Sequence, residues 1–152
     1  MIIDYISDTE PRHGSREAAG YDIPIRIDYD PLMLDEAYEM IAPNSIKIFS
    51  TGLRVQLPVG TFGDIRTRSS AIKKGLIIHA SVVDSDYRSE IHVPVYNASD
   101  RWVKVYDGEC LAQIVVQRHE TVQWNRVDRL HETERGSGSF GSSDWHGETI
   151  TI

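Results

Sequence analysis

Cysteine is nearly absent from this chain of 152 residues. Cys110 is the single example, so no disulfide can form within the chain, and a reducing compartment such as the cytoplasm is expected. Long apolar runs are also missing, since no stretch approaches the ~18 apolar residues that indicate a membrane span. The first residues, Met1 to Tyr5, lack the basic region and the apolar segment of a secretory signal. The sequence therefore predicts a globular domain that does not bind or cross a membrane.

Positive charge is scarce as well. Lysine and arginine number 16 against 23 aspartates and glutamates, which gives a formal net charge of -7. No region shows a sustained basic stripe, and this argues against stable binding to nucleic acid. An anionic substrate would need locally clustered cations. The 6 histidines show no zinc-ligand spacing.

What dominates the chain is alternation of apolar and polar residues with a period of two. This pattern puts one side of each strand in a core and the other toward water. Turn-forming residues separate the alternating segments, as at Asp107-Gly108. Many short strands favour an all-β jelly roll or barrel, and the length suits one domain. The alternating segments are residues 23–27, 46–48, 53–57, 91–95 and 103–105.

Two segments favour helix instead. Asp30 can cap a helix that starts at Pro31 and stops before Pro43, because apolar residues within it recur on one helical face. A second, shorter helix is expected over residues 70–74, ended by Gly75.

The strongest local candidate for chemistry is the polar segment Asp84-Ser85-Asp86-Tyr87-Arg88, which lies between two alternating stretches. A hairpin is expected here, and in one interpretation its acidic residues serve only the turn. Alternatively, Asp84 orients and deprotonates an attacking water, as a well-placed carboxylate can. The composition around the segment leaves both interpretations open.

Five segments, taken in this order, resemble the motifs of the trimeric dUTPase family: Ala19–Ile23, Arg68–Ser70, Val82–Arg88, Ala112–Ile114 and Arg135–Ser143. The resemblance implies a dUTPase-like β-barrel or jelly roll over residues 1–134, with the first helix as an insertion at about 30–42. A flexible Gly/Ser-rich arm and tail would occupy residues 135–152. The implied reaction is hydrolysis of dUTP to dUMP and pyrophosphate by water attack at the α-phosphorus, which limits uracil in DNA and supplies dUMP for dTMP synthesis.

The resemblance also gives roles to individual residues. Asp84 would be the catalytic base, Tyr87 would exclude a 2′-hydroxyl, and the hairpin backbone would pair with uracil. Phe140 would stack on the base while Arg135 meets the phosphates as the arm closes. Serines at 81, 89, 139 and 143 replace residues that are more usual in the family. The implied substrate contacts are Arg68, Ser69, Ser70, Ser81, Val83, Tyr87, His92, Gln113, Arg135, Phe140, Gly141 and Ser142.

Magnesium and self-association follow from the same resemblance. Mg²⁺ would be held mainly by the substrate triphosphate, with Asp22 as a ligand through water only. The chain would form a homotrimer whose sites are built from neighbouring copies. The expected location is the cytoplasm, or the cytoplasm or nucleus of a host cell if the protein is viral.

Two alternatives stay open at this point. A dCTP deaminase-like enzyme shares the fold and an Arg-Ser-Ser-like segment, but would need a glutamate-centred site. A nucleotide-sensing regulatory protein on the same fold would use the insertion at 30–42 as a surface for a protein partner.

Overall fold

The computed structural model describes residues 1–28, 36–134 and 136–138. Contacts divide the chain into two units, Met1–Thr121 and Val122–Ile152. All strands and the helix found among the described residues lie in the first unit. The boundary expected after residue 134 stays a prediction. None of the described helices is long and apolar enough to cross a membrane.

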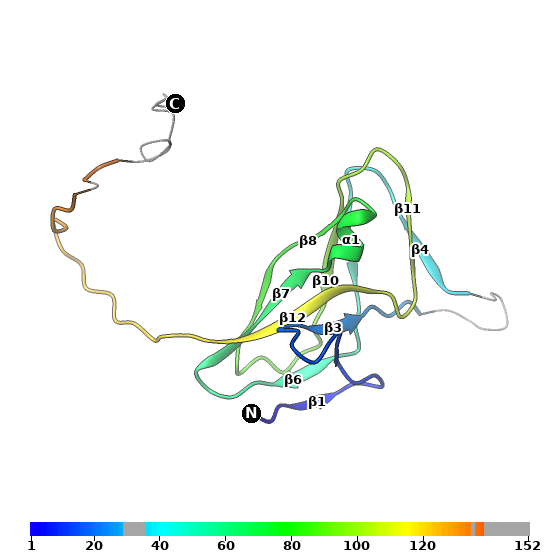
Figure 1. Ribbon diagram of the computed structural model, residues 1–152, viewed down its shortest axis with the longest axis horizontal. Helices are drawn as coiled ribbons and strands as arrows, with labels where there is room; N and C mark the ends of the chain where they lie inside the picture. The colour runs from blue at the N-terminus through cyan, green and yellow to red at the C-terminus, as the bar shows by residue number, and fades with distance from the viewer. Residues whose placement is uncertain (29–35, 135, 139–152) are drawn as a thin grey trace. The chain divides into compact units, whose positions relative to one another are not determined.

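The largest sheet has five antiparallel strands, and it carries Asp22 and Gln113 of the predicted site. Its central strand, β12 (Cys110–Arg118), pairs along most of its length with β7 (Thr61–Thr67) on one side, and its first half pairs with β3 (Tyr21–Pro24) on the other (Figure 1). In spatial order the strands are β2 (Arg12–His13), β3, β12, β7 and β9 (Ser81–Val83).

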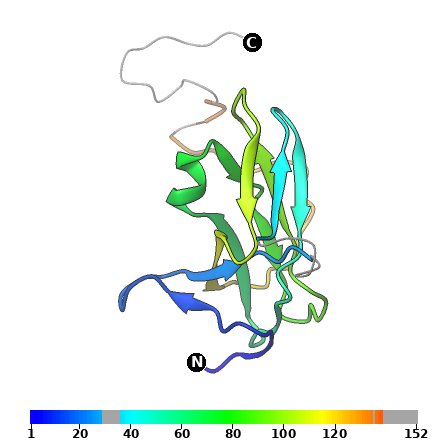
Figure 2. The same cartoon turned by 90° about the vertical axis from the view of Figure 1, so that its right-hand side faces the viewer.

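Three smaller antiparallel groups complete the first unit, seen from the side in Figure 2. A three-stranded sheet has β10 (Val93–Asn97) between β5 (Ile46–Phe49) and β8 (Leu76–Ile78). Two pairs accompany it: β4 (Tyr38–Ile41) with β11 (Val103–Tyr106), and β1 (Asp4–Ile6) with β6 (Arg54–Gln56).

A single apolar cluster joins these sheets, and it follows from the period-two pattern. Alternate residues of the strands point inward, as in β10, where Val93 and Val95 are fully buried. Ile23, Ile65 and Ile114 fill the same cluster from the five-stranded sheet. The predicted all-β jelly roll is confirmed.

The short helix is confirmed too. α1 (Ser69–Lys73) follows an extended Arg68, and Gly75 ends the turn with φ of +80°. Ala71 is its buried residue. The helix therefore begins directly after the cation of the second motif.

The prediction of a helix between Pro31 and Pro43 is wrong over residues 36–42, the part that the structure describes. Tyr38–Ile41 is a strand in register with β11, so that Tyr38 lies opposite Tyr106. The Lys104 ammonium lies 4.0 Å from the centroid of the Tyr38 ring. Pairing with β11 outweighs the helical apolar face, because cross-strand contacts and ladder hydrogen bonds reward the extended form. The earlier residues of the expected helix, 29–35, lie outside the described residues.

The period-two pattern was expected to bury the two isoleucines of β5, but they point outward. Ile46 and Ile48 are 57% and 63% exposed, whereas Phe49 is buried. Tyr96 of β10 lies opposite both Ile46 and Ile77, so these apolar side chains share the outer face of the three-stranded sheet. Exposed apolar residues gathered on one face are unusual for a surface that meets only water.

Candidate active site

The segment that carries Asp84 and Tyr87 links two sheets and is not a hairpin. β9, before it, pairs with β7, whereas β10, after it, pairs with β5 and β8. The expected strand pairing is therefore wrong, because each flanking strand finds its partner elsewhere. A tight turn remains, in which the Tyr87 N–H donates to the Asp84 carbonyl at 3.1 Å. Both side chains are exposed, so water and substrate can reach them.

Hydrogen bonds within the segment hold the turn. The Tyr87 hydroxyl donates to the Glu90 carbonyl at 2.9 Å, and His92 Nδ1 lies 3.1 Å from the same oxygen. Arg88 Nη1 donates to the carbonyls of Ser85 and Tyr87. The predicted uracil contacts lie beside it: Ser81 is half-buried and Val83 is buried, both in β9, while His92 is exposed.

Glu90 ties the end of this segment to a distant turn. Its Oε1 accepts hydrogen bonds from Ser50 Oγ, from the Thr51 N–H at 3.0 Å and from the Gly52 N–H at 2.7 Å. The bond from Ser50, followed by the one from Gly52, lowers the pKa of the Glu90 carboxyl against the opposing effect of desolvation. The carboxylate form is therefore favoured. Sequence reasoning missed this contact, since 38 to 40 residues separate the partners.

A second cluster brings together residues of three motifs. Arg68 Nε lies 2.7 Å from Asp22 Oδ1, and Arg68 Nη1 donates to the Cys110 carbonyl at 2.9 Å. Gln113 of β12 is directly opposite Asp22 of β3. Ser69 and Ser70, both exposed, begin the helix next to Arg68. A cation, a carboxylate, an amide and two hydroxyls thus gather at one end of the five-stranded sheet.

Gly20 shapes this cluster by having no side chain. A Cβ at this position would lie 2.1 Å from Gln113 Oε1. The Gln113 amide therefore occupies space that another residue at position 20 would fill. The glycine of the first motif and the glutamine of the fourth depend on each other.

A third group of polar side chains, which sequence reasoning missed, lies on the same face of the five-stranded sheet as Gln113. Asp64 is only 7% exposed, and its Oδ2 accepts from Arg66 Nε at 2.8 Å and from Gln117 Nε2 at 3.0 Å. Arg66 is opposite Gln113 in the register of β7 and β12. The signal was available, since residues two apart in a strand share a face.

Cys110 lies beside the cluster and is half-buried. Burial, and then the nearby Asp22 carboxylate, raise the pKa of its thiol. The thiol is the weaker nucleophile relative to a thiolate. Cys110 therefore behaves as a small apolar side chain and not as a nucleophile.

Within one chain, the two ends of the predicted site are far apart. In β7, Gly63 lies opposite Val83 of β9 on one side and opposite Val116 of β12 on the other. Gln113 of β12 lies opposite Arg66, which is three residues further along β7. With about 4.8 Å between strands and about 3.3 Å per residue, Asp84 is roughly 15–20 Å from the cluster of Asp22, Arg68 and Gln113. A base at that distance cannot serve a phosphorus bound at the cluster.

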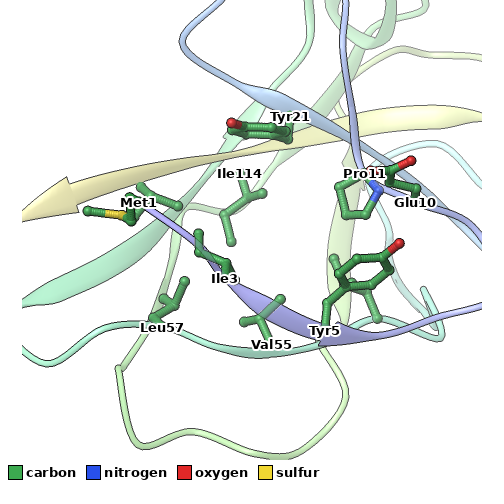
Figure 3. A pocket seen from close by; sticks show the side chains of 11 residues that line it. Met1, Ile3, Tyr5, Glu10, Pro11, Tyr21, Val55, Leu57 and Ile114 are labelled. Carbon is green, nitrogen blue, oxygen red and sulfur yellow. The ribbon is translucent and has the colours of Figure 1, made fainter.

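An apolar cavity of the first unit lies away from both of these groups. It has a volume of about 190 Å³ and lies between β1 and the sheet strands, with Ile3, Tyr21, Val55, Leu57 and Ile114 around it (Figure 3). None of the predicted site residues lines it. Across the part of the chain that the structure describes, no group of three or more His, Cys, Asp or Glu side chains could hold a metal ion by itself.

Comparison with known proteins decides the family. A profile described as dUTPase matches residues 8–144. The chain is 40% identical over 139 residues to the deoxyuridine 5'-triphosphate nucleotidohydrolase of Escherichia phage T5, which covers 90% of this chain and 92% of that protein. This chain belongs to the dUTPase family. The mitochondrial enzyme of Dictyostelium discoideum is 38% identical over 135 residues, 88% of this chain and 69% of its own.

Solved dUTPase structures have the same fold. The Staphylococcus bacteriophage 80alpha dUTPase with dUPNHPP superposes with a TM-score of 0.80 at 20% sequence identity, over 93% of this chain and 98% of that one. The native EIAV dUTPase gives a TM-score of 0.68 at 26% identity, over 84% and 97%. The predicted contacts Arg135, Phe140, Gly141 and Ser142, with Ser139 and Ser143, lie outside the described residues.

Proposed function

We propose how this chain carries out the reaction of its family, the hydrolysis of dUTP to dUMP and pyrophosphate. Asp84 accepts a proton from a water molecule as the water oxygen attacks the α-phosphorus. The bond from that phosphorus to the bridging oxygen breaks, and pyrophosphate leaves. The exposure of Asp84 at the tip of a turn supports this role, because water can reach its carboxylate.

Tyr87 sets the choice of sugar. With its hydroxyl bonded to the Glu90 carbonyl, its ring can lie against a deoxyribose and leave no room for a 2′-hydroxyl. The backbone around Ser81 and Val83, together with His92, pairs with the uracil edge, where donors and acceptors distinguish uracil from cytosine.

The cluster of Asp22, Arg68 and Gln113 receives the phosphates, with Ser69 and Ser70 beside it. Arg68 is bonded to Asp22, so a phosphate competes with that carboxylate for a guanidinium suited to bidentate contacts. The donor set fits Mg²⁺ carried mainly by the triphosphate, with Asp22 touching it only through water, since Mg²⁺ retains several waters. Bound there, the ion would neutralise phosphate charge.

The observation that carries the proposal is the separation of Asp84 from the phosphate cluster. A complete site needs Asp84 of one copy beside Arg68 of another. Such an association joins two different surfaces, and it closes into a ring when the rotation permits. The family resemblance implies three copies, so we propose a homotrimer.

Two exposed apolar regions support self-association. One is the outer face of the three-stranded sheet, with Ile46, Ile48 and Ile77. The other is in the second unit, where Trp124 is 94% exposed and Val122, Val127 and Leu130 are exposed as well. Apolar side chains of this size favour burial against another copy.

The arm that follows the second region completes the site. Arg135 would meet the phosphates and Phe140 would stack on uracil, with Gly141 and Ser142 placing backbone N–H groups near phosphate oxygens. Closure would exclude water from the reacting atoms.

The alternatives have less support. The dCTP deaminase-like interpretation is not favoured, because the family profile and the curated relatives are dUTPases. A protein partner at residues 30–42 stays a prediction, as do the cytoplasm or a host compartment. The described part of that insertion exposes Tyr38 and Met40 on β4.

The test is a chromatographic assay of dUTP and dCTP with the Asp84→Asn variant. We expect dUMP from dUTP, no dUTP from dCTP, and a loss of about 10²–10⁴-fold in kcat for the variant. Asp86→Asn is the matched control, since it makes the same chemical change in the same turn and should retain turnover. An unchanged kcat in Asp84→Asn would remove this carboxylate from the mechanism.

A further inference from the structure

We infer that Glu90 is a positioning residue of this active site: its carboxylate anchors the Asp84–Tyr87 segment to the turn at 50–52, and its carbonyl orients the Tyr87 ring. The inference rests on the proposed roles of Asp84 and Tyr87. It deepens them by identifying what holds these side chains in place.

The turn at Ser50–Gly52 is built as a receptor for a carboxylate. Two successive backbone N–H groups, of Thr51 and Gly52, and the Ser50 hydroxyl all point at one oxygen of Glu90. Gly52 has φ of +66°, which favours glycine. Consecutive N–H groups around such a residue form an anion-binding concavity, here filled by the chain's own side chain.

The neighbouring residue reinforces the same attachment. The Thr51 hydroxyl donates to the Ile91 carbonyl at 2.6 Å, and the Ile91 N–H donates to the Leu53 carbonyl at 2.8 Å. Ile91 and Leu53 both belong to the buried core. Residues 90 and 91 are therefore held on the side chain and on the backbone, and the attachment reaches the rigid interior.

The Tyr87 hydroxyl bonds to the backbone of this attached residue, at the Glu90 carbonyl. Residues 86–89 are exposed, and β9, which precedes the turn, pairs only with β7. Without the carboxylate bonds, the partner of the Tyr87 hydroxyl would lose its fixed place. The ring would then exclude a 2′-hydroxyl less sharply, because exclusion by volume requires a fixed wall.

A purely structural role makes a different prediction from a positioning role. Loss of a structural contact lowers the melting temperature and reduces the amount of active enzyme, so kcat/KM for dUTP and UTP fall together. Loss of positioning changes their ratio. The ratio also cancels any change at Asp84 that is common to both substrates.

The experiment measures kcat/KM for dUTP and for UTP in the full-length wild type, Glu90→Gln, Ser50→Ala and Glu39→Gln. Glu39, which lies on β4 away from the Asp84–Tyr87 segment, is the matched control, because its carboxylate also has a partner, Lys47 of β5. We expect the dUTP/UTP ratio to fall about ten-fold or more in Glu90→Gln, since small displacements of positioning groups have effects of that order. Ser50→Ala should move it in the same direction by less, and Glu39→Gln should leave it unchanged.

Tyr87→Phe supplies a second measurement. It removes the hydroxyl that bonds to Glu90 and leaves the carboxylate in place, so it should also lower the ratio. If Glu90 acts through that hydroxyl, combining the two substitutions should lower the dUTP/UTP ratio no further than the more damaging single substitution does. The two effects would then be clearly non-additive.

An unchanged ratio in a folded Glu90→Gln variant overturns the inference, as do independent, additive effects of the two substitutions. If Glu90→Gln does not fold, as circular dichroism would show, the decision passes to Ser50→Ala, whose ratio must fall. A wild type that does not hydrolyse dUTP refutes the proposed function instead, so the two failures are distinguishable.

Discussion

Two inactive variants of this chain should regain activity when their copies share one oligomer. Asp84→Asn removes the base, and Arg68→Ala removes the cation of the phosphate cluster. Each pure oligomer should be nearly inactive. In a mixed oligomer, an intact Asp84 from one copy can meet an intact Arg68 from its neighbour.

The magnitude follows from the separation of the two residues. Because roughly 15–20 Å lie between Asp84 and the Arg68 cluster within a chain, each complete site would draw the two residues from two different copies. After random mixing at equal amounts, a site has an intact Asp84 in half of the cases and an intact Arg68 in half. About one quarter of wild-type activity should therefore return, if association is closed and symmetric. A site contained in one chain would return none.

The assay uses two affinity tags. The variants are co-expressed in equal amounts, all oligomers are purified through a tag that both variants carry, and a second tag on one variant verifies that mixed oligomers have formed; activity is then assayed with dUTP at saturation. Wild type mixed with the Asp84→Asn, Arg68→Ala double variant is the control. At random mixing it should retain about one quarter of full activity for shared sites, against about one half for sites within one chain. No recovery in stable mixed oligomers, together with one half in the control, would refute the shared site.

Three further predictions concern selectivity and stability. Tyr87→Ala should admit UTP and narrow the dUTP/UTP ratio of kcat/KM; if both activities fall in proportion, Tyr87 is only a packing residue. Asn97→Ala should lower the free energy of unfolding, measured in urea, by about 3 kcal/mol, because the buried amide donates hydrogen bonds to the carbonyls of Ile41, Ala42 and Arg101. A loss below about 0.5 kcal/mol, which is the range of surface substitutions, would contradict this. The carboxyl of Glu90 has a lowered pKa, so its stabilisation is present above the ordinary value of 4.5 and is lost as the pH falls through the folded value. The melting temperatures of wild type and Glu90→Gln should converge as the pH falls from 7 to 3, and a constant difference would count against this origin.

The sequence predicted the features that depend on local pattern. Period-two alternation located β3, β5, β6, β10 and β11, and glycine after a short helical stretch located the end of α1. The residues of the phosphate cluster came from short motifs, and the structure brings Asp22, Arg68 and Gln113 together. The fold predictions are confirmed because each rests on a few neighbouring residues, whereas the roles of these three residues stay predictions.

The errors occurred where the deciding interaction is distant. The segment at Tyr38–Ile41 looks amphipathic as a helix, and only its partner β11, more than 60 residues later, makes it a strand. For β5, alternation gives the period but not which face is buried, so Ile48 was expected inside and lies outside. The bond from Gly52 to Glu90 joins residues 38 positions apart, and no local pattern announces it.

Charge gives the last link between the sequence and the proposed mechanism. The chain has a net charge of -7, and two arginines on the polar face of the five-stranded sheet are already bonded to carboxylates, Arg68 to Asp22 and Arg66 to Asp64. A triphosphate must therefore displace or share these pairs, and it approaches a chain whose net charge is negative. Mg²⁺ that arrives bound to the triphosphate would reduce the repulsion between substrate and protein, since a magnesium–nucleotide complex carries less negative charge. In the proposed mechanism, Asp22 pairs with Arg68 before the substrate binds and would contact metal-bound waters afterwards.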